Sequence, residues 1–450
     1  MQGSKIITVV VLITLTVVGW VSFVFDSTQQ QTNYETALSE ADKDMEQGLY
    51  QLAIKKYGYA VEYKSTAENW NKLISAYEKR FAEDETLSSD YIKILNKAIT
   101  KCGFKENFVI RLSELYVQKN NYKNAYSNLV NAEKAGTTSE NLQALKRKVL
   151  YTFTVKRREF SSFFPQYNSV YSAFNGTAWG SANANGSQDI PFEYRFISPA
   201  TDSGIRLFVD ENESKLIDAN GVLLAILKFS AKAAGGFSDG LIPVMKDDTY
   251  YYYNSYGEEQ FGGYEKAGSF VNGKAAVKKD GKWAIINNSG EYIDDKRFAD
   301  IRLALDGCYI TESTVLAASE EGAFRIYNSK WEPVEGFSCE DIDVCTSDKI
   351  IAYKSSGKWG FADTSGKIII EPQYEEAKSF SNGLAAVCQN GAWGFIDTDN
   401  NVVIDCKFAG ADYFNEEGSC MVRTDEPNID DEVIWQLIAL KLGIAGGKKH

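Results

Sequence analysis

The sequence predicts a multidomain protein of the α plus all-β class, with an apolar N-terminal helix, a helical repeat domain and a β-repeat domain. An uncharged apolar run comes first, apolar residues at helical spacing follow, and after residue 159 apolar residues alternate between glycine-bearing turns. Charge divides the chain at the same place: residues 33–158 hold 21 Lys and Arg against 16 Asp and Glu, whereas residues 159–450 hold 26 against 44. Two halves of different charge indicate two domains.

The segment 6–25 has the length and composition of a transmembrane helix. It contains no charged residue and no proline, and at 1.5 Å per residue it would span about 30 Å, the thickness of the hydrocarbon layer. The bulky residues 23–25 stand where a cleavable signal peptide needs small ones. The sequence therefore predicts an uncleaved membrane anchor.

The charges beside this segment predict its orientation. Lys5 precedes the apolar run and Asp26 follows it, so the positive-inside rule places residues 1–5 in the cytoplasm. Residues 26–32 then form a linker, and the bulk of the chain lies outside the membrane. We expect a single-pass membrane protein of the bacterial cell envelope.

Residues 33–158 predict a domain of paired helices. In the segment 41–60 the small, apolar and aromatic residues stand in the order small, apolar, Gly-x-Tyr, Ala, aromatic, Ala. A similar order recurs in the segment 112–132 and, more loosely, in the segment 70–98. The pattern resembles the tetratricopeptide repeat, a helix-turn-helix unit of about 34 residues, across residues 34–135. A closing helix is expected over 139–160.

The resemblance implies a concave face made by the first helix of each unit, on which a partner binds. The side chains expected to point toward this face are Asn71, Ser75, Glu78, Glu114 and Gln118. The apolar positions of the repeats are instead expected to form the helical core.

Between residues 159 and 428 the chain carries repeats centred on a Trp-Gly pair. The clearest copies are 357–367 and 391–397, and the segment 380–387 before the second copy recurs at 270–277 and 237–244. These motifs resemble the WG (Trp-Gly) β-repeat family, which is abundant in bacterial envelope proteins.

Alignment on the tryptophan position divides this region into seven units. The anchors are Trp179, Ser214, Tyr250, Trp283, Phe324, Trp359 and Trp393. Each unit is expected to form strand, tight turn, strand, glycine-bearing turn and strand, because glycine accepts a positive φ without steric cost. Seven such units predict a WG-repeat β-propeller of about seven blades, with an open β-solenoid as the alternative.

The C-terminal segment 429–450 is predicted as a helix followed by a short tail. Val433, Ile434, Leu437 and Ile438 have the spacing of one helical face. The helix is expected to dock on the β-repeat domain.

The residue inventory argues against catalysis and against nucleic acid as a partner. The net charge of −13 is opposite to the basic surface that phosphates require. The only histidine is His450, at the end of the chain, so no Ser-His-Asp or Cys-His arrangement is available. The seven cysteines include no CxxC pair. We expect a protein that is not an enzyme and has no cofactor or metal.

The sequence favours a membrane-anchored extracytoplasmic binding or scaffold protein that recognises a protein, a peptide or a cell-wall glycan. Four consecutive tyrosines alternate along one strand, so at least two rings should face away from the core and offer a partner contact. They are Tyr250, Tyr251, Tyr252 and Tyr253. The alternatives are a glycan hydrolase with carboxylates in the propeller centre, and a structural spacer or sensor without a small ligand.

Overall fold

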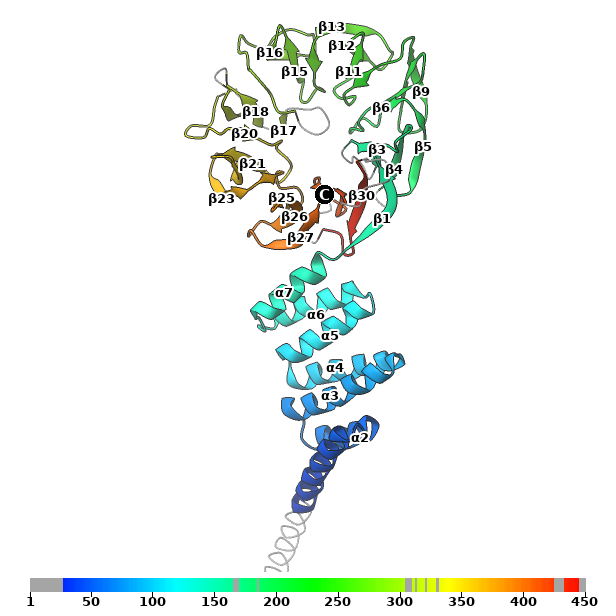
Figure 1. The fold of residues 1–450 in the computed structure, drawn as a ribbon, viewed down its shortest axis with the longest axis vertical. Coiled ribbons are helices and arrows are strands. Elements are labelled where there is room, and N and C mark those ends of the chain that lie inside the picture. Colours follow the sequence, from blue (N-terminus) through cyan, green and yellow to red (C-terminus); the bar gives the residue numbers. More distant parts are fainter. Residues whose placement is uncertain are drawn as a thin grey trace, which may run out of the picture. The chain divides into compact units, whose positions relative to one another are not determined.

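The computed structural model divides the chain into two compact units, Met1–Leu150 and Tyr151–His450 (Figure 1). The residues that the structure describes are 27–164, 170–183, 186–303, 310–311, 314–319, 322–328, 332–424 and 433–444.

The expected single-pass membrane location requires a correction. Within the described residues no helix combines the length and the apolar character needed to cross a membrane. The segment 6–25, on which that prediction was based, lies outside the described residues. The predictions of a membrane anchor and of a cell-envelope location are therefore withdrawn.

Antiparallel helices build the first unit (Figure 1). After a helix over 27–46 come α2 (Tyr50–Tyr63), α3 (Ala67–Glu83), the short 3₁₀ helix η1 (Glu85–Leu87), α4 (Ser88–Cys102), α5 (Glu106–Gln118), α6 (Tyr122–Lys134) and α7 (Glu140–Leu150). The side chains of Thr66 and Asn121 accept hydrogen bonds from backbone N–H groups in the first turns of α3 and α6, which fixes where these helices begin. The expected closing helix over 139–160 is too long, because α7 ends at Leu150.

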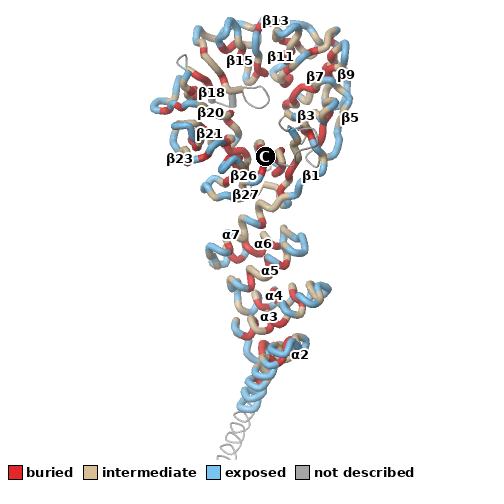
Figure 2. Tube along the Cα trace, in the orientation of Figure 1, coloured by how far each residue is buried: buried red, intermediate tan, exposed pale blue. Residues whose placement is uncertain are grey.

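Small residues at the repeat positions let the helices pack closely. Ala53, Ala60, Ala125 and Ala132 are fully buried, and large side chains fill the space between neighbouring helices. Trp70 is buried, and its indole N–H donates a hydrogen bond to Ser65 Oγ at 2.8 Å. Figure 2 shows this buried stripe along the inner faces of the helices, with exposed residues outside.

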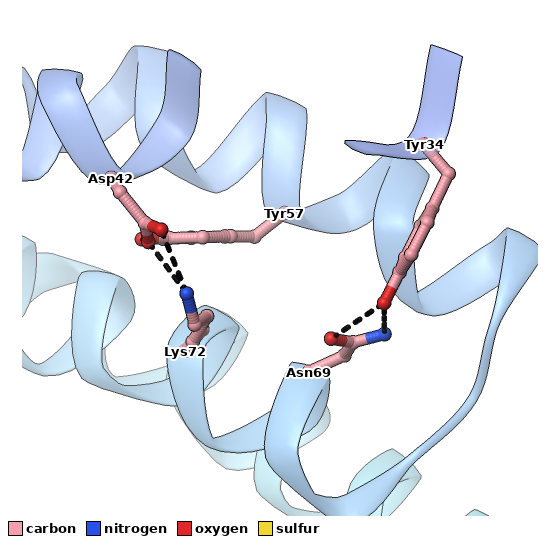
Figure 3. A network of polar contacts seen from close by, with 5 residues as sticks. All are labelled: Tyr34, Asp42, Tyr57, Asn69 and Lys72. Carbon is pink, nitrogen blue, oxygen red and sulfur yellow. Dashed lines mark hydrogen bonds and ion pairs between the residues drawn. The ribbon is translucent and has the colours of Figure 1, made fainter. Parts of the chain in front are cut away.

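Two polar networks connect the helix over 27–46 to the helices that follow it (Figure 3). The Asn69 amide nitrogen donates a hydrogen bond to the Tyr34 hydroxyl oxygen at 3.0 Å. The Lys72 ammonium donates to both carboxylate oxygens of Asp42, at 2.9 and 2.8 Å, and the Tyr57 hydroxyl donates to the same carboxylate at 2.5 Å. These contacts join residues that are 15 to 35 positions apart in the chain.

Small antiparallel sheets build the second unit, eight of them in the described part of the chain. The first three sheets consist of β2 (Ser162–Phe163), β3 (Val170–Phe174), β4 (Trp179–Asn183) and β5 (Gln188–Tyr194); β6 (Phe196–Ile197), β7 (Arg206–Val209), β8 (Ser214–Ile217) and β9 (Leu223–Leu227); and β10 (Ala233–Ala234), β11 (Leu241–Lys246), β12 (Thr249–Asn254) and β13 (Glu259–Tyr264).

Four further sheets continue in chain order. They consist of β14 (Lys266–Ala267), β15 (Lys274–Lys279) and β16 (Lys282–Asn287); β17 (Ile310–Thr311), β18 (Thr314–Ala318) and β19 (Phe324–Asn328); β20 (Asp341–Ile342), β21 (Ile350–Ser355), β22 (Lys358–Asp363) and β23 (Ile368–Tyr374); and β24 (Glu376–Ala377), β25 (Leu384–Gln389), β26 (Ala392–Asp397) and β27 (Val402–Phe408). Figure 2 shows exposed residues along the outer strands β5, β9, β13 and β23.

The eighth sheet joins the two ends of the unit. It has the order β1 (Phe153–Phe160), β30 (Trp435–Leu440), β29 (Ser419–Arg423) and β28 (Gly410–Ala411). Trp435 pairs with Arg423 as Trp393 pairs with Cys388 one sheet earlier. Trp435 is therefore the anchor of an eighth repeat. In the other four-stranded sheets the outer strand follows the anchor strand in the chain, whereas in this sheet β1, from the start of the unit, forms the outer strand.

The Trp-Gly pair is explained by the approach of the outer strand to the anchor strand. A Cβ atom on Gly394 would lie 2.6 Å from the Ile404 carbonyl oxygen and 2.7 Å from the Cys406 nitrogen. Gly360 has the same surroundings in the preceding repeat. The ladder shifts register at this point in both sheets, so glycine is needed where a β-bulge brings two backbones together.

Aromatic rings pack one sheet against the next. The rings of Phe361 and Phe380 meet edge to face with centroids 4.9 Å apart, and Phe395 and Phe414 repeat the contact at 4.8 Å. The Ser381 hydroxyl donates a hydrogen bond to the Phe414 carbonyl at 2.7 Å. Each repeat thus buries its rings against the following repeat.

The predicted fold class is wrong in two respects beyond the membrane helix. The closed seven-bladed propeller is replaced by eight small antiparallel sheets in the described residues. The helix expected within 429–450 is replaced by strand β30. Both errors have one cause: the apolar residues after Trp435 fit helical as well as strand spacing, so the predicted helix leaves the eighth repeat out of the alignment.

Candidate binding cleft in the helical unit

A cleft of about 300 Å³ opens between α3, η1, α4 and α5 in the helical unit. Three of the five residues predicted for the concave face line it. The full lining is Glu78, Phe81, Ala82, Glu85, Tyr91, Arg111, Glu114, Leu115 and Gln118.

Helical spacing explains how α5 contributes one wall. Glu114, Leu115 and Gln118 follow Arg111 by three, four and seven residues, so all four lie on one side of the helix. The opposite wall comes from the last turns of α3 and from the η1 segment. The Asp84 carboxylate accepts hydrogen bonds from the Thr86 N–H at 3.1 Å and hydroxyl at 2.6 Å, which fixes this turn.

The charges of the cleft are only partly compensated. The Arg111 Nη2 atom lies 3.4 Å from Glu78 Oε2. The Arg111 Nη1 atom is buried and has no hydrogen-bond partner among the described residues. Glu85 and Glu114 are exposed, and neither has an ion-pair partner in the described part of the chain. Three carboxylates thus face one guanidinium.

Aromatic rings form the apolar wall of the cleft. Phe81 and Tyr91 are both buried, with centroids 5.7 Å apart. Burial first, and then the charge of Glu78, raises the pKa of the Tyr91 hydroxyl, so that this group stays protonated. The Lys119 ammonium lies 5.6 Å from the centroid of the Phe81 ring.

The other two predicted residues of the concave face do not line the cleft. Asn71 is half-buried and accepts a hydrogen bond from the Asn107 side chain of α5. Ser75 is also half-buried. Sequence reasoning missed Phe81, Tyr91 and Arg111, although Arg111 is three residues before Glu114 and a helical count from the predicted residues would have included it.

The four predicted tyrosines of β12 provide little free aromatic surface. Tyr252 and Tyr253 are buried, whereas Tyr250 and Tyr251 are half-buried. The Tyr252 hydroxyl donates a hydrogen bond to the Gly268 carbonyl at 2.7 Å, and the Tyr253 hydroxyl donates to Glu259 at 3.1 Å. These rings pack within and between sheets.

Other polar groups of the second unit are engaged with one another. Asp343 accepts hydrogen bonds from the Tyr413 hydroxyl at 2.5 Å and the Ser379 N–H at 2.7 Å, and Lys378 lies 3.7 Å from Asp412. A second hollow, of about 490 Å³, is lined mainly by the acidic residues of 193 and 210–213. Within the described ranges no three His, Cys, Asp or Glu side chains are grouped so as to hold a metal ion.

Comparison with known families identifies the β repeats. The model of the family described as "WG containing repeat" matches residues 263–283, 359–391 and 393–426. The chain therefore carries WG repeats. These segments include the anchors Trp283, Trp359 and Trp393. No protein with a curated description matches the sequence.

Comparison with solved structures gives distant similarities to several proteins. Hsv2 of Kluyveromyces lactis is 13% identical, with a TM-score of 0.36, over 63% of this chain and 98% of that one. A eukaryotic initiation factor is 12% identical, with a TM-score of 0.39, over 64% and 94%. PorZ, a bacterial surface component of the type-IX secretion system of Porphyromonas gingivalis, is 9% identical, with a TM-score of 0.33, over 61% and 43%. Similarities at this level assign neither a fold nor a function to the chain.

Proposed function

We propose that the protein is a repeat-based binding or scaffold protein that recognises a protein or peptide partner through the cleft of its helical unit. The observation that carries the proposal is the lining of that cleft, in which aromatic and apolar side chains lie beside incompletely paired charges. A concave surface that combines apolar side chains with a few polar and charged groups is typical of a binding site. The resemblance of the helices to tetratricopeptide units is consistent with this role.

The WG repeats support the scaffold part of the proposal. Their rings are used between sheets, as the contacts of Phe361 with Phe380 and of Phe395 with Phe414 illustrate. In strand β12 the buried Tyr252 hydroxyl donates a hydrogen bond to the Gly268 carbonyl, which indicates that this ring is also used for packing. On this proposal the second unit is a rigid body that carries or spaces the helical unit, and a glycan contact at Tyr250 and Tyr251 is a lesser candidate.

We further propose that the protein is not an enzyme. The residues that line the cleft include no serine, cysteine or histidine, so a nucleophile with an adjacent base is lacking there. The carboxylates Asp343 and Asp412 of the second unit are occupied by Tyr413 and Lys378. The net charge of −13 disfavours nucleic acid as the partner.

Site-specific photo-crosslinking in the full-length chain tests this function. A photoreactive phenylalanine analogue replaces Gln118 in the cleft and, as the matched control, the exposed Lys55 of α2. We expect a discrete crosslinked partner from position 118 that is absent from position 55 and is lost when Glu114→Arg is added. Equal adducts from both positions, or none from position 118, would contradict the proposal. The chain with Glu114→Arg must unfold at the same temperature as the parent, so that loss of the crosslink cannot be attributed to unfolding.

A further inference from the structure

We propose that two copies of the chain associate through strand β9, so that their two sheets join edge to edge as one antiparallel sheet. This inference goes beyond the proposed function, because it concerns the second unit and not the helical cleft. β9 is the last strand in the order β6-β7-β8-β9, so it pairs with a neighbouring strand on one side only. Its other side carries backbone N–H and C=O groups with which a further strand can pair.

Large apolar side chains are exposed along this edge. They are Val222, Leu223, Leu224 and Ile226, with exposed fractions of 54%, 49%, 38% and 44%. Ala225 and Leu227 are buried in a core cluster that includes residues of the next sheet, which holds the strand in place. Figure 2 shows β9 among the exposed outer strands of the unit. A strand paired with β9 would cover part of this apolar surface, which is favourable in water.

The corresponding outer strands carry a residue that opposes such pairing. Twelve positions after the anchor stand Pro191 in β5, Glu371 in β23 and Asp405 in β27, and all three are exposed. Proline has no N–H to donate to a new strand, and a charged side chain loses its hydration when a strand covers it. Proteins commonly protect the edges of sheets in these two ways. In β9 the same position is occupied by Ile226, so this protection is absent.

The backbone of β9 is also more regular than that of β5, β23 and β27. In those three strands the pairing shifts register beside the anchor residue. β9 pairs continuously there, from Leu227 opposite Ser214 to Ala225 opposite Leu216. A bulge twists an edge strand away from a neighbouring molecule. The second repeat, which has Ser214-Lys215 in place of Trp-Gly, therefore has an outer edge that is open to pairing.

The charges at the two ends of β9 indicate that its partner is a second copy of the chain. Lys228, after the strand, is exposed and has no ion pair among the described residues. Asp218 lies in the turn before the strand, where its carboxylate accepts hydrogen bonds from the N–H groups of Asn220 at 2.9 Å and Val222 at 2.8 Å. In an antiparallel pair, Lys228 of each copy lies at the Asp218 end of the other. The same edge is used on both copies, so the association closes at two.

Sedimentation velocity of the full-length chain at several concentrations tests the inference. Two paired strands of this length bury less surface than a standard protein interface, so we expect a monomer–dimer equilibrium with a Kd on the order of 10 µM. Ile226→Glu gives this edge the type of residue that β23 has at the same position. It should raise the Kd about tenfold or more, because the two-fold symmetry buries two unpaired carboxylates.

A matched control and hydrogen–deuterium exchange locate the contact. Ile369→Glu replaces an exposed isoleucine on the outer strand β23, and it should leave the Kd unchanged. Both variants should unfold at the temperature of the parent, so that loss of the dimer cannot be attributed to unfolding. As the concentration of the parent rises through the Kd, the amides of residues 222–228 should exchange more slowly, whereas those of residues 367–371 should not change.

Several outcomes would overturn the inference. A monomer at every concentration, association without a limiting size, or a dimer that Ile226→Glu leaves intact would each do so. A photoreactive phenylalanine analogue at Leu224 should crosslink a second copy of the chain, and a crosslink to a different protein alone would also overturn it. The crosslink expected at position 118 does not involve β9, so the proposed function stands or fails independently of these results.

Discussion

At the scale of single residues, the glycine of the Trp-Gly pair is set by backbone contact. Gly394 leaves no room for a Cβ atom, because the Ile404 carbonyl and the Cys406 nitrogen lie at 2.6 and 2.7 Å from its position. Backbone atoms cannot move aside as a flexible side chain can. Gly391, three residues earlier, is needed for a different reason: its φ is +75°, and its surroundings are open.

We therefore predict opposite tolerances at these two glycines. Gly394→Ala should destabilise the second unit by about 1–3 kcal/mol, the usual cost of overpacking. Gly391→Asn should have a much smaller effect, because asparagine tolerates a positive φ. Chemical denaturation monitored by tryptophan fluorescence measures both. Equal losses of stability would show that turn conformation, and not strand approach, accounts for the glycine of the motif.

A second residue-scale prediction concerns Asp42 and acid. Burial acts to raise the pKa of this carboxyl, but the hydrogen bonds from Lys72 and Tyr57 outweigh it and hold the pKa below the ordinary 3.8. A lowered pKa in the folded state contributes stability above pH 3.8, and this contribution is lost as the pH falls through the folded-state value. The contacts of Figure 3 should therefore weaken in acid.

Asp42→Asn tests this pH dependence. At neutral pH we expect the helical unit to lose up to about 1 kcal/mol, a modest value because the ion pair is partly exposed and screened by solvent. The difference between the variant and the parent should disappear as the pH falls through the lowered folded-state pKa of Asp42, because the parent carboxylate is then also protonated. Glu46→Gln, at an exposed carboxylate of the same helix, should show neither effect. A constant difference from pH 3 to pH 7 would exclude the charge as the cause.

At the scale of elements, the sheet formed by β1 and β28–β30 is the main feature that the sequence pattern did not reveal. The apolar run after its anchor, Trp435, fits helical and strand spacing equally well. Its outer strand comes from residues 153–160, more than 270 positions earlier in the chain. Local patterns carry no information about such a distant partner.

Ile438 provides the test of this sheet. It is fully buried in strand β30, where it pairs with Cys420 on one side and Val155 on the other. Ile438→Ala should cost about 2–5 kcal/mol, as expected for truncation in a packed core. Gln436→Ala, in the same strand but at a half-buried position, should cost much less. Comparable costs at both positions would argue that the segment does not pair as a central strand.

The rest of the β unit was more predictable, because its signals are local. The anchor and the aromatic residue fifteen positions later lie opposite each other in the ladder, as in Trp359 with Tyr374 and Trp393 with Phe408. The turn glycines have the positive φ values that the pattern required, for example Gly366 at +83°. The repeat pattern therefore predicted strands and turns, whereas the number of sheets depended on the last unit, which departs from that pattern.

The cleft was predictable in part for a similar reason. The resemblance to tetratricopeptide units placed Glu78, Glu114 and Gln118 on one concave face, and the structure brings them together around the cleft. The second wall depends on η1, which forms in the lengthened turn after α3. The conformation of that turn is set by hydrogen bonds of Asp84 to Thr86, and residue spacing could not anticipate its position beside α5.

At the scale of the whole molecule, the two units have separate cores and different charge. The first unit has a core cluster around Trp70 and Leu95, whereas the second unit has several clusters, formed by residues of neighbouring sheets. The chain passes between the units once, at Leu150 and Tyr151. Domains with their own cores generally unfold as separate cooperative units.

Differential scanning calorimetry of the full-length chain should therefore resolve two transitions. Asp42→Asn should lower the transition that coincides with loss of the helical circular dichroism signal, and leave the other unchanged. Ile438→Ala should have the reverse effect, and the doubly substituted chain should show the sum of both, because sites that share no contact contribute additively. A single transition that both substitutions shift would contradict independent units. It would imply an interface whose energy is comparable with the stability of the helical unit itself.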